Sequence, residues 1–370
     1  MSLVQAVETP ARQAEVERYL GSFFDDAIVR ADAHAADYRR LWAAARDAAS
    51  GGKRIRPRLV LAAHDALAPD GAPGAGVVPS GAPGSGTHAE AVALAAAFEL
   101  LHTAFLVHDD VIDRDLVRRG EPNVAGRFAL DAALRGLERE RADAYGQASA
   151  ILAGDLLIAA AHSLVAGLDV PAARRRAILA VLDECVFAAA AGEHADVRHA
   201  AGVRPDEADI LAMIEDKTAC YSFSAPLRAG ALLAGAGPAE VARLGEIGRR
   251  LGVAFQLQDD LLGVYGDERV TGKTTLGDLR EGKETLLIAY ARGHAAWVAA
   301  SGAFGRPDLD EAGARPLRAA IEASGARARV EARIAEETTA ARTAIASAGL
   351  PDRLEAELLG LAAEATRRAK

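Results

Sequence analysis

The sequence is poor in aromatic residues and in cysteine. Phe, Trp and Tyr together make up only 5% of the 370 residues, and alanine dominates the apolar set. Because alanine is the best helix former and a poor strand former, this composition predicts an all-α protein and excludes a β-sandwich or β-barrel. Two cysteines, Cys185 and Cys220, cannot by themselves form a disulfide framework or a four-ligand zinc site. This cysteine usage indicates a reducing, cytoplasmic setting.

Positive charge is also in deficit. The chain has 43 Lys and Arg against 52 Asp and Glu, which gives a formal net charge of −9 at pH 7. Because nucleic acid is a polyanion, this balance argues against a general nucleic-acid binder. Hydrophobic residues make up 51% of the chain, enough for a sizeable core. The length allows two domains or one large helical unit, and we expect a single domain over residues 1–370.

No long uncharged apolar run is present. The most apolar stretch, Ala91–Val107, carries Glu99 and His102 and is shorter than the ~20 residues that a membrane span needs. The N-terminal segment has three glutamates within its first 17 residues and no basic start before an apolar run. We therefore expect neither a transmembrane segment nor a signal peptide.

Helical periodicity recurs through most of the chain. The expected helices span 10–48, 89–113, 145–167, 171–191, 206–234, 238–264, 284–300, 311–323 and 327–346, with one more at the C-terminus. Arg56-Pro57 begins a further helix, and another follows the loop at 116–125. The Pro/Gly/Ser-rich stretch 69–87 lacks an apolar period and predicts a flexible surface insert. The segment 265–282, rich in Gly, Thr and charge, predicts a loop or lid.

Two acidic motifs carry the chemistry. In HDDVID, Asp109 and Asp113 are spaced i, i+4, so a helix places them on one face one turn apart. In FQLQDDLLG, Asp259 and Asp260 follow a second apolar helical stretch. Two acidic pairs, each at the end of an apolar helix, are hard to explain as solvated helix ends. Such carboxylates are typical of Mg²⁺ sites that are completed by substrate phosphates, and the two pairs are expected to share one cavity.

A third group of candidate residues is basic. GGKRIRP at 51–57 places three cations in a turn that begins with two glycines, and Arg118-Arg119 follows the first motif. Lys217, Lys273 and Lys283 lie around the second motif. In an acidic protein, this grouping favours binding of a phosphorylated small molecule. Glu193-His194 and Asp196 resemble loose metal ligands, but one histidine on a helix is more often a packed or hydrogen-bonded structural residue.

The ordered motifs resemble those of the trans-isoprenyl diphosphate synthases, the polyprenyl synthetase family. The shared segments are GGKRIRP, ELLHTAFLVHDDVID, RRG, LAGD, GEHAD, DKTA, FQLQDD, TGK and DLREGKET, in the family order. The resemblance implies an all-α fold of about ten core helices around a central cavity, usually as a homodimer. It also implies head-to-tail condensation of isopentenyl diphosphate with an allylic diphosphate: dimethylallyl, geranyl or farnesyl.

The resemblance assigns roles residue by residue. Asp109, Asp113 and Asp259 would bind Mg²⁺, three ions in all when substrates are bound, with Asp110 and Asp260 supporting them. The isopentenyl diphosphate would be bound by Lys53, Arg56, His102 and Arg119. The allylic diphosphate would be bound by Arg118, Lys217, Lys273 and Lys283. Thr218 and Gln256 would line the reacting region, and no side-chain nucleophile is required.

Product length is expected to depend on the residues before the first aspartate. In the resembled family, aromatic side chains four and five positions before it form a floor for the growing chain. Here only Phe105 is aromatic, and Ala104 is small. The resemblance therefore predicts a twenty-carbon, geranylgeranyl product, with a farnesyl or a longer polyprenyl product as the alternative.

One departure from the family pattern leaves a second class of function open. The second motif usually reads DDxxD, but Gly263 replaces its third aspartate, and Asp267 in the following loop is a possible substitute. Loss of an acid would suit a non-catalytic subunit of a heteromeric prenyl synthase. The retained acids and bases favour the enzyme, and the GGKRIRP motif argues against a terpene cyclase or a head-to-head synthase, which need no isopentenyl diphosphate site.

Overall fold

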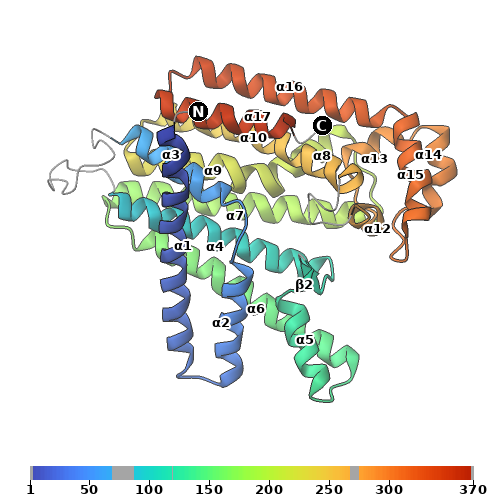
Figure 1. The fold of residues 1–370 in the computed structure, drawn as a ribbon, viewed down its shortest axis with the longest axis horizontal. Helices are drawn as coiled ribbons and strands as arrows, with labels where there is room; N and C mark the ends of the chain where they lie inside the picture. Colours follow the sequence, from blue (N-terminus) through green and yellow to red (C-terminus); the bar gives the residue numbers. More distant parts are fainter. Residues whose placement is uncertain (1–2, 69–86, 119, 267–274, 368–370) are drawn as a thin grey trace. The chain divides into compact units, whose positions relative to one another are not determined.

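The computed structural model describes residues 3–68, 87–118, 120–266 and 275–367. These residues are almost entirely helical, as the alanine-rich composition predicts (Figure 1). They divide into two compact units. Unit 1 comprises residues 1–182 and 226–237, and unit 2 comprises residues 183–225 and 238–370. The single domain expected over 1–370 stays a prediction, and each unit is described by itself.

Helix α4, His88–Ile112, is the central element of unit 1. It begins with a capping box, in which the Thr87 backbone N–H donates to the Glu90 carboxylate at 2.8 Å. Its interior is apolar, and side chains such as Leu94 and Phe98 are fully buried. Helices α3, Ile55–Leu67, and α6, Arg139–Ala166, pack along it. This packing fixes the end of α4 that carries the first acidic motif.

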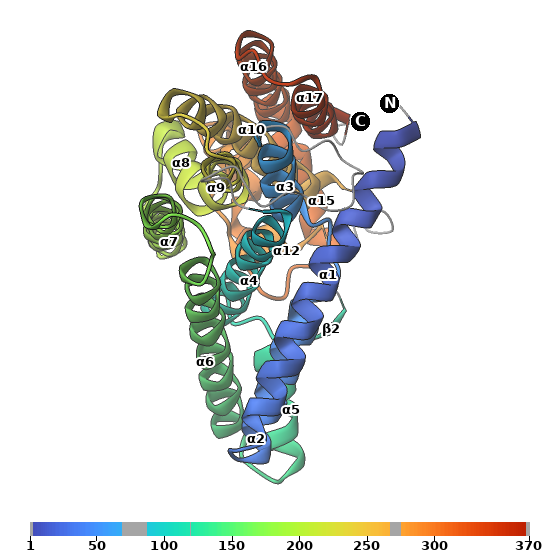
Figure 2. The same cartoon turned by 90° about the vertical axis from the view of Figure 1, so that its left-hand side faces the viewer.

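The single helix expected over 10–48 is wrong. The chain instead forms α1, Leu3–Ala31, and α2, Ala36–Ala48, which lie side by side in Figure 1 and overlap in the view of Figure 2. Reversal at 32–35 lets the apolar faces of both helices be buried against each other, with the Phe23 and Trp42 ring centroids 6.2 Å apart. The turn sequence Asp-Ala-His-Ala has no glycine or proline, so no local signal marks the break.

A short hairpin connects α4 to α5 within the expected 116–125 loop. Strands β1, Val117–Arg118, and β2, Glu121–Pro122, pair antiparallel. Helix α5, Val124–Leu134, follows at once, and the Asn123 side chain caps it by accepting a hydrogen bond from the Gly126 N–H at 2.8 Å. The hairpin returns Arg118 to the end of α4.

Helix α10, Pro238–Tyr265, is the corresponding central element of unit 2 and carries the second acidic motif. Helices α16, Ala326–Ser347, and α17, Asp352–Arg367, pack beside it (Figure 1). Its other partner is the π-helix η1, Glu215–Ser224. Gly248 and Gly252 of α10 leave no room for a Cβ against η1, so their small size sets the close approach of the two helices.

Three expected elements differ in the structure: two expected helices are divided, and one expected loop contains a helix. The range 206–234 is divided into α8, Glu207–Ile214, the π-helix η1, and α9, Ala225–Ala234, so the expectation of one regular helix is wrong. The range 284–300 is divided into α13, Leu286–Ala291, and α14, Ala295–Ala300, by a turn at Gly293. The expected loop 265–282 contains a short helix, α12, Gly277–Glu281.

The remaining elements follow the helical periodicity. They are α7, Ala172–Ala200; the 3₁₀ helix η2, Ser301–Ala303; and α15, Glu311–Ala323. Helix α7 extends nine residues beyond the range expected from the sequence. The insert at 69–87 lies outside the described residues except for Thr87.

Helices α4 and α6 are long and apolar enough to span a membrane by length and composition alone. The core helices of soluble proteins pass the same test. Most of the apolar window of α4, 78%, is buried inside the protein, which identifies α4 as a core helix. Only 39% of the α6 window is buried, so α6 leaves apolar side chains exposed.

Candidate functional site

The first acidic motif occupies the last turn of α4 in unit 1. Asp113 is the residue that ends the helix, and its backbone N–H donates to the Asp109 carbonyl at 2.8 Å. The helical turn is therefore complete, and the two carboxylates lie one turn apart as the i, i+4 spacing predicts. Asp113 is exposed and Asp109 is half-buried, so both are accessible to a ligand.

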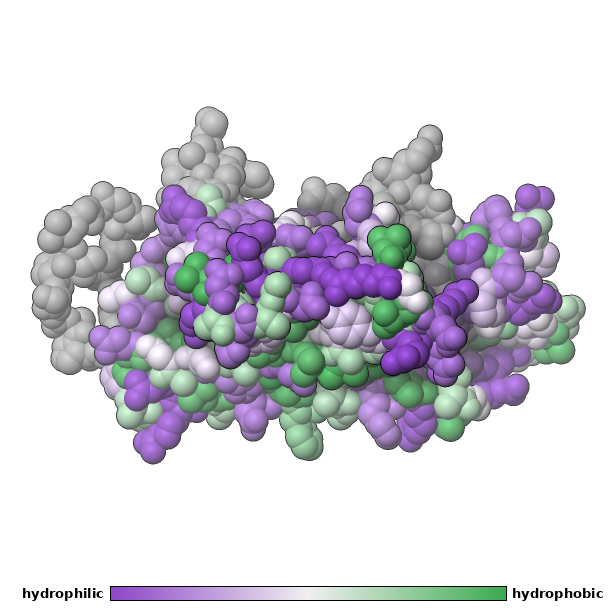
Figure 3. Space-filling model, turned by 90° about the horizontal axis from the view of Figure 1, so that it is seen from below, coloured by the Kyte–Doolittle hydropathy of each residue, from purple (hydrophilic) through white to green (hydrophobic). Residues whose placement is uncertain are grey.

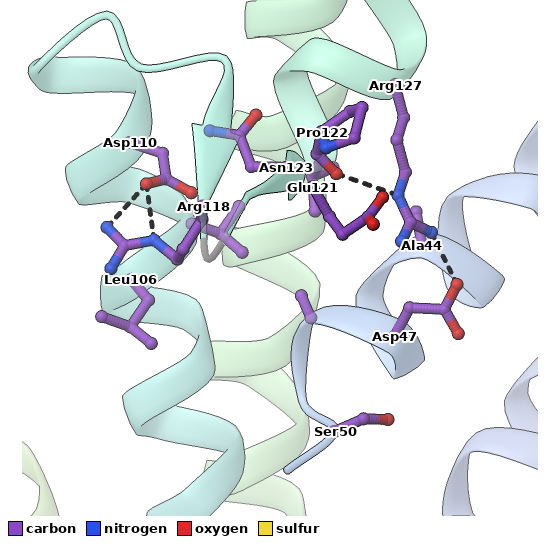
Figure 4. A pocket seen from close by; sticks show the side chains of 13 residues that line it. Ala44, Asp47, Ser50, Leu106, Asp110, Arg118, Glu121, Pro122, Asn123 and Arg127 are labelled. Atoms are coloured by element: carbon purple, nitrogen blue, oxygen red, sulfur yellow. Dashed lines mark hydrogen bonds and ion pairs between the residues drawn. The ribbon is translucent and has the colours of Figure 1, made fainter. Parts of the chain in front are cut away.

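Asp110 is oriented differently from its two neighbours. Its buried carboxylate accepts a hydrogen bond from Arg118 Nε of β1 at 2.7 Å and forms an ion pair with Arg118 Nη2 at 2.6 Å (Figure 4). Burial opposes the Arg118 charge, but Asp110 and Asp109 outweigh it and raise the Arg118 pKa. Arg118 Nη2 also lies 3.4 Å from Asp109. Asp110 therefore positions the arginine beside the first motif.

A cavity of about 240 Å³ lies beside this ion pair (Figure 4). Leu106 and Val107 of α4 form one wall, and the end of α2 forms another. Arg127 crosses its edge, donating to Asp47 at 2.6 Å and to the Pro122 carbonyl at 3.1 Å. The predicted ligands Asp109 and Asp113 do not line it, but Asp110 and Arg118 do, so this cavity adjoins the first acidic motif.

Arg54 anchors the GGKRIRP turn. It is the arginine of this motif for which no substrate-binding role is predicted. Arg54 has a left-handed backbone with φ of 49°, and its side chain is buried. It contacts Glu17 and Glu99 at 2.6 Å each and the Ala49 carbonyl at 2.8 Å. Glu99 precedes His102 on α4 by three residues, so this ion pair ties the turn to α4 one helical turn before His102.

Two of the cations predicted to bind isopentenyl diphosphate belong to the GGKRIRP segment, and a third lies on α4. Lys53 is exposed, Arg56 is half-buried in the first turn of α3, and His102 is half-buried on α4. All three belong to unit 1. The fourth predicted ligand, Arg119, lies outside the described residues, as does Lys273 of the allylic set.

The second acidic motif is at the end of α10 in unit 2. Asp259 is exposed, whereas Asp260 is buried and accepts a hydrogen bond from Gln256 Nε2 at 2.9 Å. Burial raises the pKa of Asp260 to about 6, and the Lys283 ammonium, 3.7 Å away, opposes that rise. As at the first motif, one carboxylate is accessible and its neighbour holds a basic side chain.

Lys217 lies on the π-helix η1 and is bound by two acids of α7. Its Nζ is 2.9 Å from Glu193 and 2.6 Å from Asp196. These two acids therefore act as partners of a lysine, which replaces the weak metal-ligand interpretation of the sequence. A Cβ on Gly192 would overlap the Lys217 backbone, so this glycine permits the contact between α7 and η1. Thr218 is half-buried next to Lys217.

Asp278 of α12 is a residue to which sequence reasoning gave no role. A Cβ on Gly263 would overlap the Asp278 Oδ2 and lie 3.0 Å from its Cγ. Burial lowers the Lys283 pKa, but Asp278 and Asp260 outweigh burial and hold it well above the usual lysine value. The motif DLREGKET contained the signal, since Asp278 lies five residues before Lys283. Asp267, the substitute considered from the sequence, lies outside the described residues.

The donor chemistry of both motifs fits magnesium. Among the described residues, no three His, Cys, Asp or Glu side chains converge closely enough to enclose an ion by themselves. Mg²⁺ is usually held by one or two carboxylates together with waters and substrate phosphates. Accessible carboxylates with nearby cations for a diphosphate match that mode of binding.

Known proteins with similar sequences and structures bear on this arrangement. Residues 39–298 match the family model named polyprenyl synthetase. Geranylfarnesyl diphosphate synthase of Aeropyrum pernix is 37% identical over 247 residues, 65% of this chain and 67% of that protein. (2E,6E)-Farnesyl diphosphate synthase of Mycobacterium tuberculosis is 34% identical over 319 residues, 84% of this chain and 78% of that protein.

The fold has solved counterparts as well. The crystal structure of geranylgeranyl pyrophosphate synthase from Corynebacterium glutamicum, complexed with isoprenyl diphosphate and magnesium, matches with a TM-score of 0.86. The match covers 96% of this chain and 98% of that one, at 28% sequence identity. With the family model extending over more than half of the sequence, the chain belongs to the polyprenyl synthetase family and is a prenyltransferase.

Proposed function

We propose that the protein catalyses the Mg²⁺-dependent, head-to-tail condensation of isopentenyl diphosphate with an allylic diphosphate. The observation that carries the proposal is the repeated pattern at the ends of α4 and α10. Each end presents an accessible carboxylate, Asp109 or Asp259, next to a buried aspartate that contacts a basic side chain. A diphosphate with its metal ions needs both kinds of group.

By the family resemblance, the allylic diphosphate is assigned to cations that lie beside these acids within each unit. Arg118 is positioned by Asp110, Lys283 lies beside Asp260, and Lys217 is held between two acids of α7. Lys273 belongs to this set by resemblance. Asp109, Asp113 and Asp259 would hold Mg²⁺, which would supply positive charge to neutralise a departing diphosphate.

The isopentenyl diphosphate is assigned to the turn that Arg54 anchors. Lys53 and Arg56 extend from it, and His102 is one helical turn from the anchoring Glu99. Arg119 joins this set by resemblance. Because Lys53 and Arg56 extend from a fixed turn and His102 lies on the helix to which that turn is tied, these groups are suited to orient the second substrate without taking part in bond making.

The chemistry uses charge stabilisation instead of a nucleophile. When the allylic carbon–oxygen bond breaks, Arg118, Lys217 and Lys283 stabilise the negative charge on the leaving diphosphate. The resulting cation is attacked by the double bond of isopentenyl diphosphate, and a proton is then lost to the released diphosphate. Apolar residues such as Ala104 exclude water, which would otherwise quench the cation.

The proposed product has twenty carbons. The relatives' names range from farnesyl to geranylfarnesyl products, so the names alone leave the length open. Ala104 is fully buried on α4 and Phe105 is half-buried, five and four residues before Asp109. A single aromatic at these positions supports a deeper pocket than two would, and so supports a geranylgeranyl product.

The proposed assembly is a homodimer. Within unit 1, α6 exposes Ile151 and Leu152, 45% and 56% accessible. Within unit 2, Phe187 of α7 is 81% accessible. Figure 3 shows apolar side chains among polar ones on the face it displays. Exposed apolar side chains on two long helices favour burial against a second copy.

Gly263 is the observation that favours a non-catalytic subunit. Incubation of the purified protein with isopentenyl diphosphate, an allylic diphosphate and Mg²⁺ separates the two functions. The enzyme forms product, loses activity when the metal is chelated, and regains it when Mg²⁺ is restored. Full activity in excess chelator would contradict the metal-dependent function, and no product with any allylic starter would support the subunit.

A further inference from the structure

Gly263 occupies the position at which the second acidic motif lacks its third aspartate. Helix α10 contacts α12, and the three atoms that a Cβ on Gly263 would approach most closely all belong to the Asp278 side chain. A methyl group at 263 would overlap Oδ2 of that side chain. The absence of a side chain on α10 therefore makes room for a carboxylate that comes from α12.

Helix α12 holds Asp278 in this position through contacts on both sides. Leu279, the next residue, is fully buried, and its carbonyl accepts a hydrogen bond from the Gly305 N–H at 2.9 Å. Arg280 Nε donates to the Leu309 carbonyl at 2.7 Å. Gly282 ends the helix with φ of 70°, a left-handed conformation that glycine adopts without strain. A five-residue helix fixed in this way defines where the Asp278 side chain starts.

Asp278 also belongs to the charge cluster of the second motif. The Lys283 backbone N–H donates to the Asp278 carbonyl at 2.9 Å, so the two residues share one turn of chain. Lys283 Nζ in turn lies 3.7 Å from Asp260. All of these residues belong to unit 2. The carboxylate that fills the Gly263 space is thus next to the acids and the lysine of the second motif.

We propose that Asp278 supplies, from α12, the third carboxylate of the second acidic motif, and that Gly263 is required to admit it. Asp278 is a positioning residue: it completes the negative charge that attracts a divalent cation to Asp259 and keeps Lys283 beside Asp260. The inference rests on the proposed function and accounts for a complete site despite the departure at 263.

The first test measures metal binding and not turnover. Mn²⁺, detected by electron paramagnetic resonance, is titrated into the protein in the presence of inorganic pyrophosphate. Asp278→Asn, which keeps the shape and removes the charge, is expected to weaken Mn²⁺ binding about tenfold or more. The matched control Asp308→Asn removes an exposed acid of the same unit that pairs only with Arg306 in the described contacts, and it is expected to bind Mn²⁺ as the wild type does.

The second test moves the carboxylate from one helix to the other. Asp278→Ala removes it, Gly263→Asp places a carboxylate on α10 that collides with Asp278, and each alone is expected to weaken Mn²⁺ binding. The double variant Gly263→Asp/Asp278→Ala is expected to recover affinity to within about threefold of the wild type, a shift below 1 kcal/mol. A role for Asp278 in folding alone predicts no such recovery.

The outcomes separate the inference from the proposed function. A wild type that binds no Mn²⁺ with pyrophosphate contradicts the function itself. A wild type that binds, together with Asp278→Asn of equal affinity, overturns the inference. A folded double variant that binds no better than Asp278→Ala also overturns it. If Asp278→Asn does not fold, the comparison of the double variant with Gly263→Asp decides, and circular dichroism establishes which variants are folded.

Discussion

At the scale of single residues, neighbouring side chains of one motif have separate tasks. Asp109 is accessible, whereas the adjacent Asp110 is buried against Arg118. In the GGKRIRP turn, Arg54 is buried between two glutamates, whereas Lys53 is exposed. A buried charge that loses its partner is costly, so the residues that hold these pairs are needed for stability as well as for function.

Substitutions at Asp109 and Asp110 are therefore expected to have different consequences. Asp109→Asn removes a predicted metal ligand and should lower turnover by about 100-fold or more, with an unchanged free energy of unfolding. Asp110→Asn leaves the Arg118 guanidinium without its buried anion and should lower the free energy of unfolding by about 1–3 kcal/mol as well. Steady-state kinetics and urea unfolding measure the two effects. Equal stability of both variants would contradict the division of roles.

Ala104 and Phe105, five and four residues before Asp109, carry the prediction on product length. Ala104→Phe adds a second aromatic at the proposed floor and should shorten the product to farnesyl length. Phe105→Ala should lengthen it. If Phe105 serves only as core packing, its removal should instead cost up to ~3–5 kcal/mol of stability and leave product length unchanged. Chromatographic sizing of the products distinguishes these results, and unchanged lengths in both folded variants would reject the floor assignment.

At the scale of helices, a charged cluster joins the N-terminal half of α1 to the end of α3 and the start of α4. Asp65 of α3 contacts Arg12 of α1 at 2.8 Å and His64 at 2.9 Å, and His88 of α4 lies beside both Asp65 and Glu15. A hydrogen bond with Asp65 is the largest cause of a rise in the His88 pKa, which reaches about 9 against the opposing effect of burial. His88 is therefore charged at neutral pH in the folded protein.

This pKa shift predicts how stability depends on pH. Because the folded pKa exceeds the unfolded value of 6.5, the His88 contribution is fully present below about pH 6.5 and is lost as pH rises through about 9. The side chain is half-exposed, so solvent screening limits the contribution to about 1 kcal/mol. Urea unfolding of the wild type and His88→Gln should differ at pH 6 and converge at pH 10. A difference that persists at pH 10 would contradict the assignment.

The sequence predicts a helix correctly where the apolar periodicity of the segment itself determines the helix. The long apolar core of α4 and the ends of α10, α15 and α16 follow the periodicity closely. The break at 32–35 and the π-helix η1 were not predicted, because both arise from packing between segments. For η1, the close partners are glycines on α10 that are distant in sequence. Local patterns carry no record of such contacts.

In the candidate site too, some features follow from the local sequence, whereas others depend on contacts between helices. The acidic ligands and cations that we predict follow from motif order, since each motif is a short run of residues. The roles of Arg54, of Glu193 and of Asp278 depend on partners from other helices, and the sequence alone does not specify them. The residue types are known from the sequence, and the structure adds which of these residues contact one another.

At the scale of the whole molecule, the family fold is retained at low sequence identity. At 28% identity, the C. glutamicum structure matches with a TM-score of 0.86 over nearly the full length of both chains. The apolar side chains that α6 and α7 leave exposed do not pack in the core, so we expect them to lie in the interface of the proposed homodimer.

The homodimer prediction is tested by placing a charge on the exposed apolar side of α7. Phe187→Glu should shift the protein from dimer to monomer in sedimentation velocity, because burying an unpaired carboxylate at an interface is costly. The control Val298→Glu changes another exposed apolar residue, 66% accessible, on α14 and should leave the dimer intact. A monomeric wild type would contradict the prediction.

The central claim is that this chain elongates an allylic diphosphate by five-carbon units under metal control. The most direct measurement incubates the purified protein with labelled isopentenyl diphosphate, Mg²⁺ and each of dimethylallyl, geranyl and farnesyl diphosphate, and determines the chain length of the labelled products. The account predicts a twenty-carbon diphosphate as the main product, formed only when the metal is present. Absence of labelled prenyl diphosphate with all three starters would contradict it.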